Sequence, residues 1–307
     1  MPYVIHDRKY HFSSIFDPKT GAYVRTGIIE DGEDTGIDPF MASFPHLIDV
    51  GVMGHCIHGK TGLCVKAGIG CYQSGLTVDE PNMAVDDFRG IAEQCRHKTN
   101  QFALGGRGDP DQHEHFEDLL RICRDNDIVP NFTTSGYGMT PEIAALCKKY
   151  CGAVAVSWYR SDYTLRAIQM LLAAGVKTNI HYVLGKNTID EALERLGAAD
   201  FPIGINGIVF LLHKPAGLGS QTNVLSDDDP RVAEFFRYVE CGSTRYKVGV
   251  DKQTDISITK TLLIMNQRSI TSHYTRCHCI IVKDIVNIVI RVWHVCPCGT
   301  ILLFENI

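Results

Sequence analysis

Three cysteines on one glycine-rich segment are the residues of this chain best suited to chemistry. Cys56, Cys64 and Cys71 have the spacing C-x7-C-x6-C and follow an apolar run, 46–53, that is typical of a buried strand. Thiolates are ligands for zinc and for iron–sulfur clusters. The segment is rich in glycine, which accepts positive φ at little steric cost and lets a loop fold tightly around an inorganic group. The pattern predicts a metal or iron–sulfur site.

A structural zinc site is the alternative interpretation of the same thiols, with His55 or His58 as the fourth ligand. The spacing differs from the C-x2-C pairs of a zinc ribbon. Other cysteines lie in predicted helices or at their ends, where a buried free thiol acts as a small apolar side chain. We interpret these as packing residues: Cys95, Cys123, Cys147 and Cys151.

Composition narrows the class of protein. The 307 residues suffice for one large α/β domain or two smaller ones. A net charge of −5 without a long basic run argues against nucleic acid as a partner. The first residues lack the apolar core of a signal peptide, and no run of about 18 uncharged apolar residues predicts a membrane span. We therefore expect a cytoplasmic protein, whose twelve cysteines are ligands or buried thiols rather than disulfides.

Strand-like and helix-like segments alternate between about residue 45 and residue 215. The predicted strands are 46–53, 101–104, 128–134, 153–158, 176–184 and 207–213. The predicted helices are 85–98, 112–127, one capped by Thr140 with Pro141 in its first turn, 162–174 ending at Gly175, and one opened by a capping box of Thr188 and Glu191. Apolar strands that alternate with helices indicate a parallel sheet covered on its faces.

Reactive residues stand at or just beyond the ends of these strands, in the cysteine loop and in the stretches GGRGDP, TTSG, SWYR, HYVL and HKP. Groups that converge from many strands on one rim are typical of a (β/α) barrel, closed or partial. We expect an α/β fold with a partial (β/α)6 TIM-like barrel. The expected divisions are an N-terminal extension with a small hairpin (1–44), the barrel (45–220), a helical connection (221–250) and an atypical, β-rich, cysteine-containing tail (251–307).

Together these features resemble the radical S-adenosylmethionine (SAM) superfamily, over roughly residues 45–220. The resemblance rests on three cysteines after the first strand and on the blocks FALGGRGDP, NFTTSG, AVAVSWY, TNIHYVL and FLLHKPAGLG. Most of that superfamily has the cluster motif C-x3-C-x2-C. The longer C-x7-C-x6-C loop and these blocks are similar to a bacterial branch of it, for which the resemblance gives fold and cofactor but no substrate.

The resemblance implies that Cys56, Cys64 and Cys71 hold three irons of a [4Fe–4S] cluster and leave the fourth iron open to SAM. An electron from the cluster would break a carbon–sulfur bond of SAM and release a 5′-deoxyadenosyl radical. That radical would abstract hydrogen from an unknown substrate, for which a peptide or protein is the class we expect. The electron would come from a reductant protein such as a flavodoxin or ferredoxin.

SAM-binding positions follow from the same resemblance. A GGEP-like turn would meet the methionine end of SAM, two strand-end serines would contact its ribose or carboxylate, and a histidine on the fifth strand would face the rim: Gly105, Gly106, Arg107, Gly108, Asp109, Ser135, Ser157 and His181. His213 and Lys214, after the sixth strand, would lie nearer the substrate. The plainer alternatives are a turn before a helix, ordinary strand-end hydroxyls and a core histidine.

Two further questions stay open at this point. A zinc-stabilised binding or regulatory protein on a barrel scaffold is the rival function, and a catalytically inactive relative is a third. The tail holds two C-x-C pairs suited to zinc or an auxiliary cluster, at Cys277, Cys279, Cys296 and Cys298. Incidental cysteines in a small β-hairpin region are the plainer interpretation of the tail, and translation out of frame is a further hypothesis; we assign the tail no function.

Overall fold

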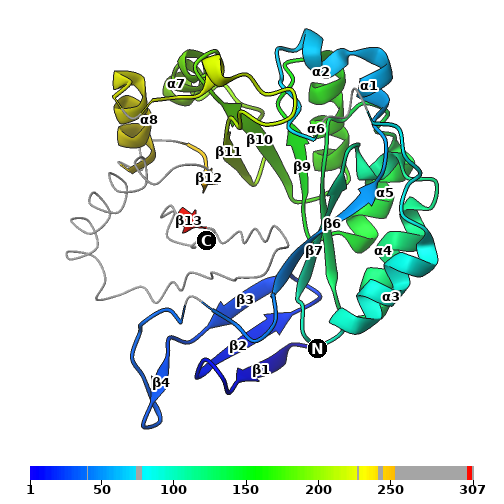
Figure 1. Cartoon of the computed structure of the whole chain (residues 1–307), viewed down its shortest axis with the longest axis vertical. Helices are drawn as coiled ribbons and strands as arrows, with labels where there is room; N and C mark the ends of the chain where they lie inside the picture. The colour runs from blue at the N-terminus through cyan, green and yellow to red at the C-terminus, as the bar shows by residue number, and fades with distance from the viewer. Residues whose placement is uncertain (40, 74–77, 227, 241–244, 253–302, 306–307) are drawn as a thin grey trace.

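The computed structural model describes residues 1–39, 41–73, 78–226, 228–240, 245–252 and 303–305, and its centre is an eight-stranded parallel sheet (Figure 1). The strands follow chain order across the sheet. They are β6 (Leu47–Met53), β7 (Gln101–Gly106), β8 (Val129–Thr134), β9 (Val154–Ser157), β10 (Thr178–Leu184), β11 (Gly207–Leu212), β12 (Val248–Lys252) and β13 (Leu303–Glu305). In the part of the chain that is described, β6 and β13 form the two edges, so the barrel is partial. The predicted fold class and all six predicted strands are confirmed.

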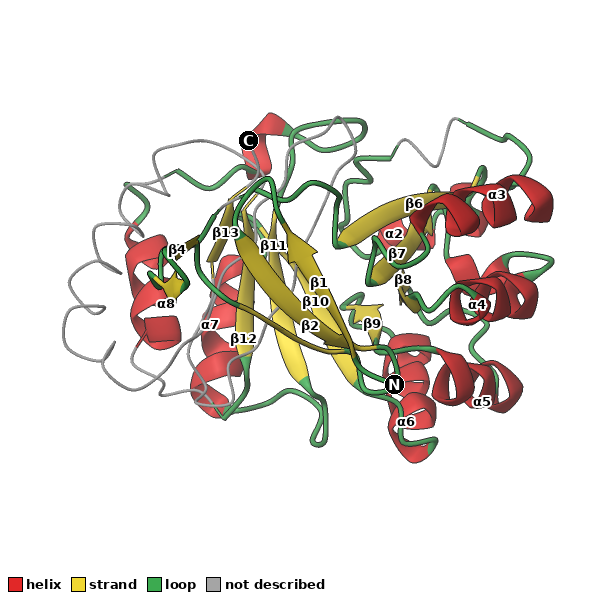
Figure 2. Ribbon diagram, turned by 90° about the horizontal axis from the view of Figure 1, so that it is seen from below, coloured by secondary structure: helices red, strands yellow, loops and turns green. Residues whose placement is uncertain are grey.

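Helices cover the outer face of this sheet (Figures 1 and 2). They are α3 (Val85–Cys95), α4 (Phe116–Asp125), α5 (Pro141–Tyr150), α6 (Asp162–Ala173), α7 (Ile189–Ala198) and α8 (Pro230–Glu240), with the short η1 (Pro110–Gln112) and η2 (Gln221–Asn223). The predicted start of α5 is confirmed, because the Thr140 hydroxyl accepts a hydrogen bond from the Ile143 amide at 3.3 Å. Gly175 has φ 75° just after α6, as the predicted left-handed end requires.

The strands alternate between two surroundings, and this alternation decides which side chains line the inside of the barrel. Along β10, Ile180 and Tyr182 are fully buried. The intervening Asn179, His181 and Val183 are half-buried on the other face of the strand. Cys95, Cys123 and Cys147 are buried free thiols among apolar side chains, which confirms them as packing residues. No helix in the described ranges is long and apolar enough to cross a membrane.

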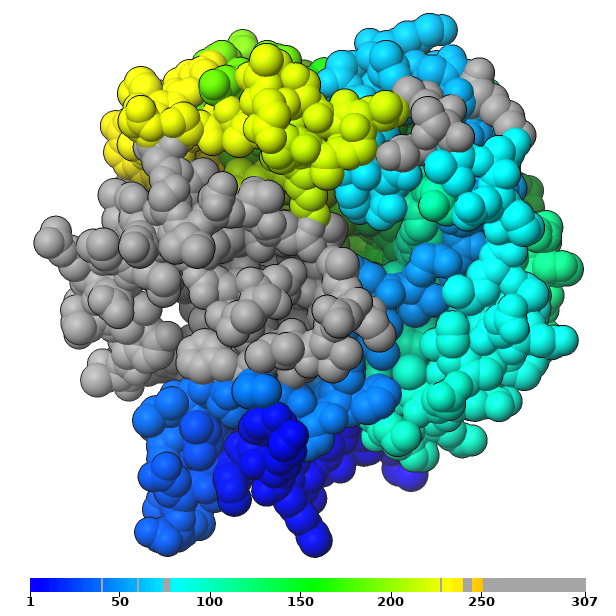
Figure 3. Space-filling view, in the orientation of Figure 1, coloured from blue at the N-terminus to red at the C-terminus, as the bar shows by residue number. Residues whose placement is uncertain are grey.

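The N-terminal residues form an antiparallel meander of β1 (Tyr3–Asp7), β2 (Phe12–Asp17) and β3 (Ala22–Arg25), followed by a hairpin of β4 (Ile29–Glu30) and β5 (Glu33–Asp34). Tyr3 donates a hydrogen bond to Asn100, just before β7, and Tyr23 bonds His46, just before β6. The meander therefore lies at the amino ends of the strands. Figure 3 shows its dark-blue atoms at the opposite end of the molecule from the light-blue cysteine loop.

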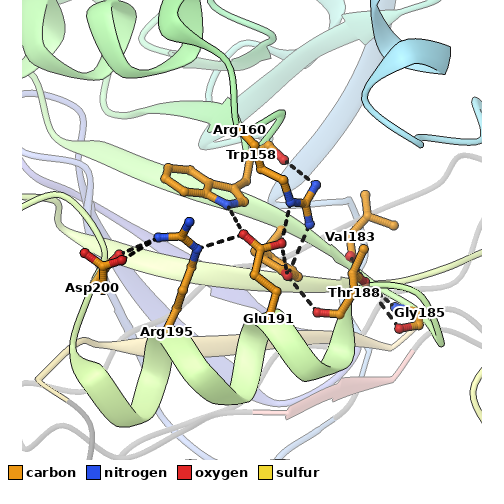
Figure 4. Close-up of polar contacts among 9 residues, drawn as sticks. Trp158, Arg160, Val183, Gly185, Thr188, Glu191, Arg195 and Asp200 are labelled. Atoms are coloured by element: carbon orange, nitrogen blue, oxygen red, sulfur yellow. Dashed lines mark hydrogen bonds and ion pairs between the residues drawn. The ribbon is translucent and has the colours of Figure 1, made fainter.

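One local prediction is wrong: Thr188 and Glu191 do not form a capping box. Thr188 makes no side-chain capping bond, and its hydroxyl instead donates to the Val183 carbonyl at 2.8 Å. Glu191 instead forms ion pairs with Arg160 and Arg195 and accepts a hydrogen bond from the Trp158 indole N–H (Figure 4). Hydrogen bonds between charged groups are stronger than the neutral one that a capping box would offer this carboxylate. The carboxylate thereby ties α7 to the loop that follows β9, a contact across some 30 residues that a local motif cannot foresee.

Candidate metal cluster and cofactor site

The cysteine loop, residues 54–73, contains two short helices where the sequence indicated an irregular loop. Cys56 is the residue before α1 (Ile57–Thr61), and Cys64 is buried in α2 (Leu63–Lys66). Gly62, with φ 65°, turns the chain sharply between the two helices. Cys71 lies outside both helices. All three thiols are free.

The three thiols lie close enough to one another to interact electrostatically. Burial raises the pKa of the Cys56 thiol, and negative charge on Asp109 and Cys64 raises it further. Burial likewise raises the pKa of Cys64, with a contribution from Cys71. Without a positive partner, Cys56 and Cys64 therefore favour the protonated thiol at neutral pH. A bound cationic group would favour the thiolates and release their protons.

The arrangement of donors also bears on which metal group fits. Within the described residues, no three His, Cys, Asp or Glu side chains are placed to hold one metal ion. A [4Fe–4S] cube needs no such convergence, because each thiolate binds its own iron. Of the two histidines proposed for zinc, His55 places Nδ1 3.3 Å from the Glu80 carbonyl oxygen. His58 Nε2 bonds Ser135 and Asp109, while its Nδ1 is buried without a hydrogen-bond partner among the described residues. Three free thiols on one loop are the donors that such a cluster takes from a protein.

A polar network joins the cysteine loop to the ends of β7 and β8. His58, in α1, places Nε2 2.6 Å from the Ser135 hydroxyl and 3.3 Å from Asp109 Oδ2. Ser135 donates to the same carboxylate through its hydroxyl and through its backbone N–H, the latter at 2.9 Å. The side chains of His58 and Ser135 are buried and that of Asp109 is nearly so, which strengthens the interactions among them. The predicted residues Asp109 and Ser135 therefore lie together, beside the cysteine loop.

The glycine-rich turn after β7 packs directly under the first cysteine. Gly105 and Gly106 are the last residues of β7. A Cβ added at Gly108 would lie 2.4 Å from the His55 carbonyl oxygen and 3.3 Å from Cys56 Cα, so only glycine permits this approach. Arg107 donates to Glu80 at 2.9 Å, an ion pair at the outer side of the turn.

Ser157 and His181 lie beside each other deeper in the barrel. They are register partners in the parallel pair β9–β10. His181 Nδ1 is 3.2 Å from the Thr133 hydroxyl, which belongs to β8. This contact agrees with an inward direction for His181.

Two tyrosines that sequence reasoning did not single out pack against His58, and a third packs against one of them. The His58 ring packs edge-on against Tyr137 and Tyr159, with centroids 5.7 and 6.1 Å apart, and Tyr137 packs against Tyr163. Burial raises the pKa of Tyr159 strongly, and negative charge on Asp109 and the thiols adds to the rise. Tyr137 comes directly after the stretch TTSG that ends β8, and Tyr159 lies in SWYR after β9. That position after a strand was the only available signal.

Asp111, on η1, is a buried carboxyl next to this network. Its side chain is 5 % exposed, and neither oxygen makes a hydrogen bond of standard geometry within the described ranges. Burial, together with the negative charge of Asp109, raises the pKa of Asp111 to about 7, although the nearby Thr134 hydroxyl offsets part of the rise. Sequence reasoning missed this residue because nothing local distinguishes it from a solvated turn aspartate.

Comparison with solved structures identifies the class of fold: the chain has the partial-barrel fold of the radical SAM enzymes. SuiB of Streptococcus suis bound to its precursor peptide SuiA is similar with a TM-score of 0.60 and 12 % identity, over 85 % of this chain and 75 % of SuiB. SuiB bound to S-adenosylmethionine has a TM-score of 0.55 and 11 % identity, over 79 % of this chain and 70 % of SuiB.

A second enzyme extends this likeness of fold. The FeFe-hydrogenase maturase HydG of Carboxydothermus hydrogenoformans has a TM-score of 0.50 and 12 % identity, over 71 % of this chain and 56 % of HydG. No protein-family model matches the chain, and no curated protein matches it by sequence. The predicted tail cysteines Cys277, Cys279, Cys296 and Cys298 lie outside the described residues.

Proposed function

We propose that this chain is a radical SAM enzyme that acts on a peptide or protein. The observation that carries the proposal is the joint position of the thiols and the strand ends: the cysteine loop is bonded through His58 to Asp109 and Ser135, which follow β7 and β8. The fold, shared with SuiB and HydG, supports the same class. The structure of SuiB with a precursor peptide supports a peptide as the substrate class.

In this proposal Cys56, Cys64 and Cys71 hold a [4Fe–4S] cluster. With SAM bound, the cluster supplies reductive cleavage to a 5′-deoxyadenosyl radical for hydrogen abstraction. The protein's own part is to bind and orient. Gly108 brings the β7 turn against Cys56, and Ser135 fixes the direction of the Asp109 carboxylate, which places negative charge beside the thiols.

Ser157 and His181, inside the barrel, would contact the nucleoside or the substrate. A reductant protein such as a flavodoxin or ferredoxin supplies the electron. The reaction takes place in the cytoplasm, where reducing conditions keep the thiols free.

The test is anaerobic reconstitution of the full chain with iron and sulfide. We expect a brown protein with about four irons that converts SAM to 5′-deoxyadenosine under a strong reductant. Cys64→Ala should lose both properties, and Cys95→Ala, at the buried last residue of α3, should keep them. A colourless protein with one zinc would establish the rival zinc-stabilised binding protein. A full cluster without SAM cleavage would indicate an inactive relative.

A further inference from the structure

The segment that follows β11, residues 213–220, lies against the cysteine loop, and we call it the β11 loop. Figure 3 shows the yellow-green atoms after β11 meeting light-blue atoms of the cysteine loop above a hollow. The Leu218 backbone N–H donates a hydrogen bond to the Cys71 carbonyl oxygen at 2.9 Å. A Cβ added at Gly70 would lie 2.9 Å from the Leu218 carbonyl oxygen and 3.0 Å from Gly219 Cα. The two backbones are thus in direct contact.

The β11 loop is itself braced from within. His213 is 6 % exposed, and its Nε2 lies 3.0 Å from the Ser220 carbonyl oxygen, so the ring closes the loop at both ends. Its backbone N–H donates to Leu184, the last residue of β10, at 2.8 Å. The expected position of His213 nearer the substrate stays a prediction beside this bracing contact. The β11 loop is therefore fixed relative to the ends of β10 and β11.

A third contact involves the residue after the last cysteine. The Lys214 ammonium lies over the Tyr72 ring, 4.9 Å from its centroid, in a cation–π arrangement. Gly70, Cys71 and Tyr72 are consecutive, and each meets the β11 loop. Three consecutive residues of the cysteine loop therefore contact a segment some 145 residues away in the sequence.

The three thiols differ in how they are held. Cys56 immediately precedes α1 and Cys64 lies within α2, and local backbone hydrogen bonds from Gly59 and Ile69 to their carbonyl oxygens hold them. Cys71 follows both helices, and its carbonyl oxygen bonds the β11 loop. We propose that the β11 loop is a positioning element for the cluster: it holds Cys71, the third ligand, in place against the other two. This inference rests on the proposed function, because it assigns a role toward the cluster.

The decisive variants remove the contact from either side. Leu218→Pro deletes the donating N–H, and Leu218→Ala keeps it while trimming a side chain that is 39 % exposed. Gly70→Ala pushes a Cβ into the Leu218 carbonyl oxygen, and Gly90→Ala adds one in open space on α3. Each reconstituted protein is measured for iron content and for the EPR spectrum and midpoint potential of the reduced cluster, with circular dichroism as the check on folding.

We expect Leu218→Pro and Gly70→Ala to retain less than half of the wild-type iron, or to shift the spectrum and potential of the cluster that remains. Leu218→Ala and Gly90→Ala should match the wild type. If Leu218→Pro does not fold, Gly70→Ala decides alone, because its backbone angles are open to alanine. Wild-type iron, spectrum and potential in folded Leu218→Pro and Gly70→Ala would overturn the inference. A wild-type protein that binds no cluster would instead overturn the proposed function, so the two failures are distinct.

Discussion

Replacement of Asp111 by asparagine should change how the stability of the protein depends on pH. The carboxyl has a folded-state pKa of about 7, against an ordinary value of 3.8, because it is buried and lies near Asp109. Between these two values the folded state binds the proton and the unfolded state has released it. The free energy of unfolding therefore falls as pH rises through this window, and it levels off above pH 7.

The size of the effect follows from the difference between the folded and unfolded pKa values of Asp111. That difference corresponds to about 4 kcal/mol for complete ionisation. About 2–3 kcal/mol of this is lost between pH 5 and pH 8. An asparagine amide cannot ionise, so Asp111→Asn should escape that loss and melt roughly 5 °C higher than the wild type at pH 8, relative to their difference at pH 5.

Thermal unfolding at a series of pH values, followed by circular dichroism, measures this difference. Asp125→Asn is the matched control, because Asp125 is exposed on the last turn of α4 and its replacement should leave the pH profile unchanged. Parallel curves for the wild type and Asp111→Asn from pH 5 to pH 8 would refute the reasoning. They would mean that Asp111 ionises in the folded protein as it does in water.

Two further substitutions test the site and its support. Gly108→Ala should cut reconstituted iron to less than half, because the His55 carbonyl oxygen must retreat by about 1 Å to restore ordinary contact. Gly105→Ala adds its Cβ in open space and should bind iron normally. Equal iron in the two variants would contradict the packing argument. Glu191→Gln should lower the free energy of unfolding by about 1–3 kcal/mol, because Arg160 and Arg195 both lose their charged partner. Chemical denaturation measures this loss, and it should show no comparable loss for Glu194→Gln, which changes an exposed residue of the same helix.

The fold was accessible from the sequence because its strands and helices are marked locally. Six apolar runs separated by helical segments define the parallel sheet, and signals such as Thr140 and Gly175 mark helix ends that the structure reproduces. Strand β12 was missed because Val248–Lys252 is short and partly polar, so it is recognisable only beside β11. The capping box failed where Glu191 found charged partners distant in sequence.

The residues of the candidate site also divide into those that the sequence marks locally and those whose roles depend on residues distant in the sequence. The resemblance singled out Asp109 and Ser135, which lie in the segments after β7 and β8, and parallel strands bring their carboxyl ends together. The part played by His58 was not predictable, since its partners lie 51 and 77 residues away. The same holds for the bond from Leu218 to Cys71. Burial of Asp111 likewise depends on packing that only the folded chain creates.

The most direct test of the proposed function is the EPR spectrum of the reduced, reconstituted protein before and after addition of SAM. A cluster held by Cys56, Cys64 and Cys71 has one iron without a protein ligand, so SAM should bind there and change the spectrum. The account predicts a SAM-dependent change in the wild type and in Cys95→Ala. A cluster signal that SAM leaves unaltered, or one that survives replacement of all three loop cysteines, would contradict it.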